Sequence, residues 1–346
     1  MVAHTSSAPE RAAAIGTGMG MLRRIRKNSS ALFFLALSAC GLSGCNAPAP
    51  LDDAAMNALH ALPLSQPAKP MRVFHLGHSL VGRDMPSMLQ QLAGPGHLHE
   101  SQLGWGTSLK AHWGDAPIEG FETENSHPRF RDAKDALESG EYDTLVMTEM
   151  VEIRDAIKYY DSWKYLSRWA IRAWKANSAT RVYLYETWHP SDDPEGWLAR
   201  IDADLSRYWE NEILRRALAA PGMEHPIYVI PAGQVLARFV RTMEAKGGVD
   251  GIKGKEDLFA RNENGDHDTI HLNDIGAYLV ALTHYAVLYH RSPVGLPHQL
   301  RLADGSPADA PGQNAARLMQ EVVWQVVTTY PKTGLKQSRR TSQLND

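Results

Sequence analysis

Two short stretches, far apart in the chain, carry residues that could perform nucleophilic chemistry together. The first is RVFHLGHSLVGRDMPSML at residues 72–89, in which Ser79 follows an apolar run and precedes a helical pattern. The second is DHDTIHLNDIGAYL at residues 266–279, which contains Asp268 and His271. A serine hydroxyl is a weak nucleophile until a base removes its proton, and a histidine held by an aspartate is such a base. The two stretches together predict a catalytic triad.

Each stretch also has a structural interpretation. A serine before a helix is commonly an N-cap that accepts a backbone N–H. The aspartate and histidine could be loop residues that precede a helix capped by Asn273 or Asp274. Alternatively, His267, Asp268 and His271 could ligate a metal, because imidazole and carboxylate are usual ligands. No second cluster of histidine or cysteine supplies the remaining ligands, so we predict no metal and no organic cofactor.

The elements that must position these residues follow an alternating pattern. Four runs rich in apolar, β-branched or aromatic residues predict strands, and each precedes a helical pattern. The runs cover 71–77, 142–148, 180–188 and 225–232, and the helical patterns cover 85–93, 162–177, 196–220 and 233–246. Such alternation implies parallel pairing through right-handed crossovers. The continuous apolar character of the strands indicates helices on both faces. The sequence therefore predicts an α/β fold, a three-layer α/β/α sandwich with a mostly parallel central sheet.

The remaining segments have weaker patterns. Residues 107–140 show no strand pattern and predict a loop with a short helix that caps the edge of the sheet. Residues 274–290 predict the last helix of the main domain, and residues 314–330 predict one further helix. We expect the main domain at 71–295, a C-terminal extension packed on it at 296–335, and a disordered tail at 336–346.

The N-terminal 45 residues resemble a bacterial lipoprotein signal peptide. A basic region at 23–27 precedes the apolar run ALFFLALSA, and LSGC then ends at Cys45. LSAC, which ends at Cys40, matches the same pattern, but its use would leave a shorter apolar run. A transmembrane anchor is the alternative, although a span requires about 20 apolar residues. We predict lipidation at Cys45, which would be followed by an Ala/Pro-rich tether at 46–70.

This signal places the protein on the periplasmic side of the bacterial cell envelope, and the lack of an aspartate after Cys45 favours the outer membrane. Both cysteines of the chain lie in the signal, so the domain must be stabilised by a core and not by disulfides. About 300 residues remain for that core. A formal net charge of −3 and the absence of a basic stripe argue against nucleic-acid binding.

The two reactive stretches within this α/β pattern resemble the SGNH/GDSL hydrolase family. The similarity rests on Gly-x-Ser-Leu after the first strand and on Asp-x-x-His before the last helix, and it spans residues 71 to about 292. The resemblance implies a flavodoxin-like sandwich. It also implies that Ser79 is the nucleophile, that His271 is the general base and then acid, and that Asp268 orients it.

The middle blocks of the family pattern match less well. The family uses a glycine N–H in its oxyanion hole, and LGWGTSLKAHW offers Gly104 and Gly106, of which Gly106 better fits the family stretch. The family's third-block asparagine is missing, and Thr148 followed by Glu149 stands at that point. Carbohydrate acetylesterase branches have Gln-Glu there. The resemblance therefore implies an oxyanion hole formed by Ser79, Gly106 and Thr148.

Polar and aromatic residues at the carboxyl ends of the later strands are expected at the cleft. We predict that Glu149, Trp188 and His189 contact substrate, with Glu186 close by, because an aromatic ring beside polar groups suits a sugar. In the structural alternative, Trp188 packs over the end of the sheet and the charged groups are paired. The tryptophans of the predicted helix at 162–177 are expected to pack in the core; they are Trp163, Trp169 and Trp174.

These features predict a serine esterase that removes an O-acetyl group from a carbohydrate through an acyl-enzyme. One alternative is a lipase, thioesterase or arylesterase on the same triad. Another is a non-catalytic envelope lipoprotein that binds polysaccharide or helps to modify it. The missing asparagine supports the latter, and the intact Ser79, Asp268 and His271 argue against it. The expected partners are a small ester or O-acylated carbohydrate and, through the lipid anchor, a membrane.

Overall fold

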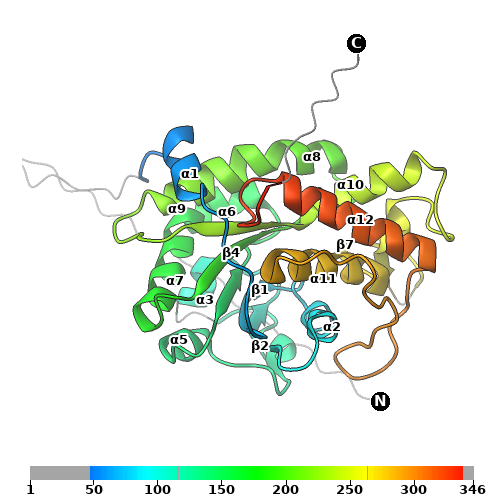
Figure 1. The fold of residues 1–346 in the computed structure, drawn as a ribbon, viewed down its shortest axis with the longest axis horizontal. Coiled ribbons are helices and arrows are strands. Elements are labelled where there is room, and N and C mark those ends of the chain that lie inside the picture. Colours follow the sequence, from blue (N-terminus) through cyan, green and yellow to red (C-terminus); the bar gives the residue numbers. More distant parts are fainter. Residues whose placement is uncertain (1–46, 115–116, 263, 338–346) are drawn as a thin grey trace, which may run out of the picture. The chain divides into compact units, whose positions relative to one another are not determined.

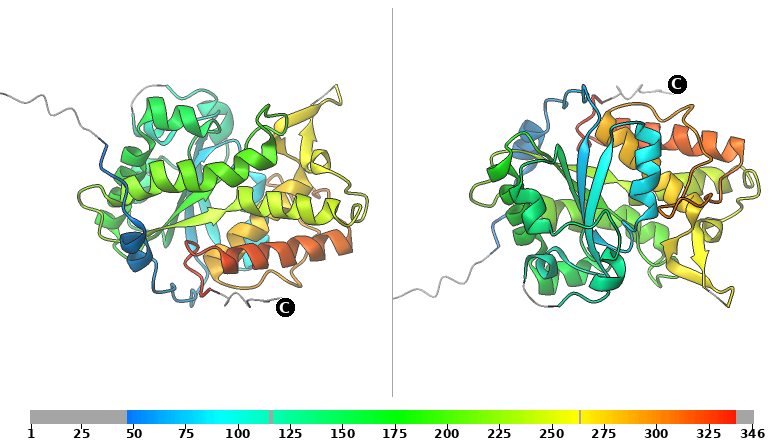
Figure 2. Two further views of the ribbon diagram at one scale, coloured as in Figure 1. Left: turned by 90° about the horizontal axis from the view of Figure 1, so that it is seen from above. Right: turned by 90° about the horizontal axis from the view of Figure 1, so that it is seen from below.

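The computed structural model describes residues 47–114, 117–262 and 264–337, and a five-stranded parallel sheet lies at its centre (Figure 1). The strand order is β2-β1-β3-β4-β5. The strands are β1 (Arg72–His78), β2 (Leu98–Gly104), β3 (Thr144–Met147), β4 (Arg181–Glu186) and β5 (Ile227–Pro231). Helices cover both faces of the sheet, as the views in Figure 2 also show. The predicted α/β/α sandwich with a mostly parallel sheet is confirmed.

One face of the sheet packs against a group of helices that includes the predicted last helix of the domain. These are α2 (Asp84–Ala93), α8 (Trp197–Asp204), α10 (Ala232–Glu244), α11 (Asp274–Tyr289) and α12 (Gln313–Thr329). Helix α11 packs against α2, α10 and α12 and is buried from Gly276 almost without interruption to its end, which explains its apolar sequence. Asn273 caps it by accepting the Gly276 N–H at 3.0 Å.

The opposite face packs against a second group of helices around a second apolar cluster. These are α1 (Asp53–Leu59), α3 (Leu109–Trp113), α5 (Ala133–Glu138), α6 (Ile153–Tyr160), α7 (Ser162–Ala176), the π-helix η1 (Leu205–Leu214) and α9 (Arg215–Leu218). Trp169 and Trp174 are buried in this cluster, and Trp163 packs partly buried against it. The prediction that these three tryptophans serve the core is confirmed.

Strand β2 has no counterpart among the strands that the sequence predicts. It lies at the edge of the sheet, and its polar sequence LHESQLG lacks the apolar run that marks a strand covered on both faces. Glu100 instead pairs with Arg72 of β1 at 3.0 Å. The segment beyond β2 forms α3, α4 (Phe121–Asn125) and α5, and it meets the edge through a bridge between Ser101 and Phe130. This segment does cap the edge of the sheet, with three short helices where one was expected.

The prediction that residues 46–70 form a tether outside the domain is wrong. Residues 47–70 belong to the same compact unit as the rest of the described domain, since α1 buries Met56 in the second cluster and Arg215 donates to the Leu51 carbonyl at 2.8 Å. Apolar residues inside this Ala/Pro-rich stretch are sufficient to dock it. The domain therefore begins near Ala47 and not near Met71.

The C-terminal extension is integral to the domain. Helix α12 contributes buried residues to the first cluster, and the Lys332 carbonyl accepts the Val229 N–H of β5 at 2.8 Å. No described helix is long and apolar enough to cross a membrane. The predicted signal peptide with Cys40 and Cys45, and the tail beyond Gln337, lie outside the described residues.

Candidate active site

Ser79 lies at the carboxyl end of β1, next to the point where the strand order changes direction. In a sheet of order 2-1-3-4-5, ligands bind outside the carboxyl ends of the strands on either side of that switch. Ser79 begins a turn in which the His78 carbonyl accepts the Val81 N–H at 2.9 Å. Helix α2 begins only at Asp84, so Ser79 is not its N-cap. The structural interpretation of Ser79 as a helix N-cap is therefore wrong.

Asp268, His271 and Ser79 form one chain of hydrogen bonds. His271 Nε2 accepts from Ser79 Oγ at 2.9 Å, and His271 Nδ1 donates to Asp268 Oδ2 at 2.7 Å. This assignment of the protons follows from the network, because a carboxylate can only accept. The His271 side chain is 44% exposed, so the chain is open to an incoming molecule. The arrangement can remove a proton from the hydroxyl as it attacks an electrophile.

The carboxylate at the end of this chain is held by its own backbone. Asp268 Oδ1 accepts the N–H groups of Ile270 at 2.8 Å and of His271 at 2.9 Å. Burial acts to raise the pKa of Asp268, but these two N–H groups and the imidazole outweigh it, and the pKa lies below its ordinary value. Asp268 is therefore ionised at neutral pH and can stabilise a protonated His271.

The element that carries Asp268 and His271 is a strand and not the expected loop. Strand β7 (His267–Leu272) pairs antiparallel with β6 (Phe259–Arg261), and a short 3-10 helix, η2 (Lys255–Leu258), precedes them. Gly276 of α11 allows this hairpin to approach, because a Cβ there would lie 2.6 Å from the Leu258 carbonyl oxygen. The Asp268 side chain turns back onto the Ile270 and His271 N–H groups, and this local turn brings its Oδ2 within 2.7 Å of His271 Nδ1.

Two hydrogen bonds join the hairpin to the loop after β4. Trp188 Nε1 donates to the Ile270 carbonyl at 2.8 Å, and the Ser191 N–H donates to the Thr269 carbonyl at 2.6 Å. Both acceptors lie between Asp268 and His271 in the sequence. Trp188, which is predicted to contact the substrate, lines the cavity beside Ser79. The structure adds that Trp188 holds the strand that presents the base.

Two buried histidines hold the end of β1, a role that the sequence pattern does not predict. His78 Nε2 donates to the Glu149 carbonyl at 2.7 Å, while its Nδ1 accepts the Leu80 N–H at 3.3 Å. His112 Nε2 donates to the Gly77 carbonyl at 2.7 Å, and its Nδ1 accepts from the Gln102 amide at 3.0 Å. Burial lowers the pKa of each histidine to about 4. Both imidazoles are therefore neutral, and each acts as a clamp that fixes the backbone next to Ser79.

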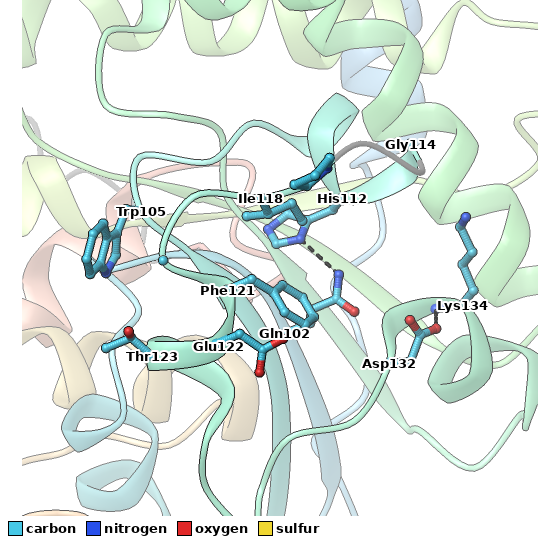
Figure 3. Close-up of a pocket in the computed structure, with 12 residues that line it drawn as sticks. Gln102, Trp105, His112, Gly114, Ile118, Phe121, Glu122, Thr123, Asp132 and Lys134 are labelled. Carbon is cyan, nitrogen blue, oxygen red and sulfur yellow. Dashed lines mark hydrogen bonds between the residues drawn. The ribbon is translucent and has the colours of Figure 1, made fainter.

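The cavity that contains Ser79 and His271 is small, at about 110 Å³. Its apolar wall is formed by Leu80, Val81, Met85, Trp188, Leu272, Ala277 and Val280, and the polar residues Asp84, Asn273 and Asp274 also line it. A larger cavity of about 600 Å³ lies off the end of β2, with Trp105 at one end and Asp132 and Lys134 at the other (Figure 3). It contains no triad residue.

The structure does not support Thr148 as an oxyanion donor. Its side chain is fully buried, its Cγ2 packs against Gly77, and its hydroxyl donates to the Glu149 carbonyl at 3.4 Å. It does not line the cavity of Ser79. Gly106 is exposed with a φ of 53° in the turn after β2, and the strand register pairs Gly104 with His78. That the Gly106 N–H and the Ser79 N–H donate to the oxyanion stays a prediction.

The prediction that Glu149 and His189 contact the substrate is wrong, because both side chains are buried away from the cavity of Ser79. Glu149 Oε2 accepts the Met150 N–H at 3.1 Å, and burial raises its pKa to about 7. His189 Nε2 lies 3.2 Å from Asp204, which also pairs with the buried Arg200 at 2.8 Å. Strand-end position suggested a cleft for both residues, but their side chains turn into the domain.

Glu186 behaves in the same way. It is buried at the end of β4 and accepts from the Gln234 backbone and side chain at 3.3 and 3.1 Å, which satisfies the start of α10. Burial raises its pKa to about 8. Among the described residues, no three His, Cys, Asp or Glu side chains are grouped as a metal site. His267 is exposed on β7, and Asp268 already bonds His271.

Comparisons with known proteins give no family. No family model matches the chain, and no curated protein matches it. Among solved structures, a DUF4886 family protein from Bacteroides uniformis is 16% identical with a TM-score of 0.48, over 79% of this chain and 99% of that one. A gut microbial diltiazem-metabolizing enzyme is 13% identical with a TM-score of 0.35, over 73% and 54%. Such low similarity transfers no activity to this chain.

Proposed function

We propose that this protein is a serine hydrolase that cleaves a short-chain ester through Ser79, His271 and Asp268. The observation that carries the proposal is the hydrogen-bonded chain from the Asp268 carboxylate through His271 to the Ser79 hydroxyl, at 2.7 and 2.9 Å. An aspartate and a histidine in this order activate a serine hydroxyl. The resemblance to SGNH/GDSL hydrolases, which rests on the same three residues, points to the same chemistry.

The reaction would proceed in two halves. Ser79 Oγ attacks the ester carbonyl while His271 Nε2 takes its proton, and the Asp268 carboxylate stabilises the resulting imidazolium. His271 then protonates the departing alcohol, which leaves the acyl group on Ser79. A water molecule, deprotonated by His271, hydrolyses this acyl-enzyme and restores the serine.

The size of the cavity supports a short acyl group. A volume of about 110 Å³ beside Ser79 accommodates an acetyl group and favours a short acyl group over a fatty acyl chain. Its apolar wall includes Val81 and Val280 and suits a methyl group. We therefore propose an acetyl ester as the substrate, with a carbohydrate as the alcohol, and we place lipase activity second.

The test is hydrolysis of p-nitrophenyl acetate, butyrate and octanoate by the full chain in detergent, beside Ser79→Ala. We expect acetate to be the best substrate and the variant to lose activity by a factor of about 10³ or more. Preference for octanoate would favour a lipase. Equal inactivity of both proteins on these esters and on acetylated polysaccharide would favour the non-catalytic alternative.

We also propose that the chain is a lipoprotein on the periplasmic side of the bacterial envelope, anchored at Cys45. The support is the order of basic, apolar and LSGC segments in the sequence. Metabolic labelling with palmitate should mark the wild type and Cys40→Ser but not Cys45→Ser. The opposite pattern in the two variants would move the anchor to Cys40.

A further inference from the structure

A third cavity, of about 260 Å³, adjoins the cavity of Ser79, since Gly82 lines both. Its walls come from α2, β2 and the segment before α5. The lining side chains that can hydrogen-bond or carry charge are Arg83, Ser87, Gln90, His99, Ser101, His127 and Arg129. It contains no carboxylate. In a chain of formal net charge −3, a cavity lined by two arginines and two histidines needs an explanation.

Two ring nitrogens of this cavity have no hydrogen-bond partner. His99 is only 6% exposed, and its buried Nδ1 is unpartnered. His127 Nδ1 accepts the Arg129 N–H at 3.1 Å, so the proton of the neutral ring sits on Nε2, which is also buried and unpartnered. A buried polar group without a partner costs about 1–3 kcal/mol. A ligand with hydrogen-bond acceptors would remove this cost.

Among the described residues, Arg129 forms no ion pair that would neutralise its charge. Its side chain donates one hydrogen bond there, to Gln90 Oε1 at 3.5 Å. Arg83 donates to the backbone carbonyls of Glu124 and Thr123, so it too lacks a carboxylate partner in the described chain. Two uncompensated guanidinium groups therefore border one cavity.

Three carboxylates, those of Asp84, Glu124 and Asp304, line an adjoining cavity that shares Arg83 and His127 with this one. Each has another partner: Asp84 accepts the Ala303 N–H at 2.8 Å, Glu124 accepts from Trp105 Nε1 at 2.9 Å, and Asp304 accepts the Ser306 N–H at 2.8 Å. Arg129 also acts to lower the pKa of His99, whose pKa burial brings to about 3. An anion between Arg129 and His99 would replace this unfavourable interaction with attraction to both side chains. The cavity thus offers donors and positive charge, without a competing acceptor among its lining side chains.

We propose that this cavity binds one oxyanion group, a carboxylate, phosphate or sulfate, carried by the ester on which Ser79 acts. The guanidinium groups supply paired donors for such an anion, and His99 and His127 supply single donors. The shared Gly82 places the anion site next to the acyl cavity. The link to the ester rests on the proposed function, whereas the binding of an anion does not.

The test compares three acetyl esters that differ only in the group at C6 of the sugar: an acetylated methyl glucoside, an acetylated methyl glucuronide and an acetylated methyl glucoside 6-phosphate. We expect at least a tenfold higher kcat/KM for one of the acidic esters, expressed mainly in KM. Arg129→Gln should abolish that preference and Arg129→Lys should retain part of it. The matched control is Arg131→Gln, which removes an arginine that pairs with Glu141 at 2.8 Å outside the cavity.

Direct binding separates this proposal from the esterase proposal. Calorimetric titration of full-chain Ser79→Ala with D-glucuronate and with inorganic phosphate should show binding that Arg129→Gln, added to this variant, abolishes and Arg131→Gln preserves. Binding without ester hydrolysis by the wild type would keep the anion site and overturn the esterase. Hydrolysis with no preference for an acidic ester and no binding of either anion would overturn the site and keep the esterase. Equal effects of the two arginine variants would also overturn the site.

Discussion

The two halves of the triad are held in different ways. Ser79 follows β1, the neighbour of both β2 and β3 in the sheet, and the turn is clamped by His78 and His112 from inside the domain. Asp268 and His271 lie on a two-stranded hairpin at the surface, joined to the loop after β4 by two hydrogen bonds. The nucleophile therefore depends on the core, whereas the base depends on an added element. Changes at the first should cost stability, and changes at the second should cost activity.

The largest effect should come from the hairpin side. His271→Ala removes the base, and kcat/KM for an acetyl ester should fall by about 10⁴-fold. Because the side chain is 44% exposed, the free energy of unfolding should change by only about 0.5 kcal/mol. Steady-state kinetics and urea unfolding measure the two quantities.

His267→Ala is the matched control for this prediction, since it removes an exposed histidine from the same strand. It should leave kcat/KM within about twofold of wild type. A loss as large as that of His271→Ala would instead support the metal interpretation of His267, Asp268 and His271.

The next largest effect is the pH dependence of stability, which comes from buried groups in the core. Burial lowers the pKa of His78, His112 and His284 to about 4, so the native state keeps them neutral while the unfolded chain protonates near pH 6.5. Stability should therefore be lost as pH falls from 6.5 towards 4, by about 3 kcal/mol for one such histidine. Glu149 and Glu186 act in the opposite direction, because their raised pKa values, about 7 and 8, cost stability as pH rises through them.

Urea unfolding at pH 4.5, 6 and 8.5 measures this dependence. We expect the highest midpoint near pH 6 and lower midpoints on both sides. A midpoint that does not change between pH 6.5 and 4.5 would show that the buried histidines are already satisfied when protonated.

A single clamp can be removed on the core side. His112→Leu removes the hydrogen bond to the Gly77 carbonyl and the one from the Gln102 amide NH₂, so the free energy of unfolding should fall by about 2 kcal/mol. Activity should fall as well, because Gly77 is two residues from Ser79. Unchanged stability with lost activity would contradict the assignment of this histidine to the core.

The smallest effect should come from one bond to the hairpin. Trp188→Phe removes the hydrogen bond to Ile270, and kcat should fall by about tenfold, with a stability loss of about 1 kcal/mol. Trp174→Phe is the control, because its indole also makes one bond, to the Thr180 carbonyl at 2.9 Å, on the opposite face of the sheet. Equal kinetic effects in the two variants would remove the special role of Trp188.

The sequence allowed the fold and the triad to be predicted, because both depend on short patterns. Parallel strands were readable where helices cover both faces, but β2 was not, since its polar residues bond to Arg72 and His112 instead of packing in the core. Ser79, Asp268 and His271 stood out by residue type and local spacing. Their structural partners are distant in sequence, so the clamp from His112 to Gly77 had no local signal.

The wrong site predictions share one cause. Thr148, Glu149 and His189 follow strand ends, where a polar residue suggests a cleft. Successive side chains of an extended chain point to opposite sides, so position at a strand end does not decide which side faces the ligand. Trp188 and His189 illustrate this, because the first lines the cavity and the second, its neighbour, bonds Asp204 in the interior.

The most direct test of the account is covalent labelling of the full chain with a fluorophosphonate, followed by peptide mass spectrometry. An activated serine reacts with this probe, whereas an ordinary surface serine does not. We predict one adduct, on Ser79, that is strongly reduced in His271→Ala and absent in Ser79→Ala. An unlabelled Ser79 in the folded wild type, or labelling that does not depend on His271, would contradict the proposed triad.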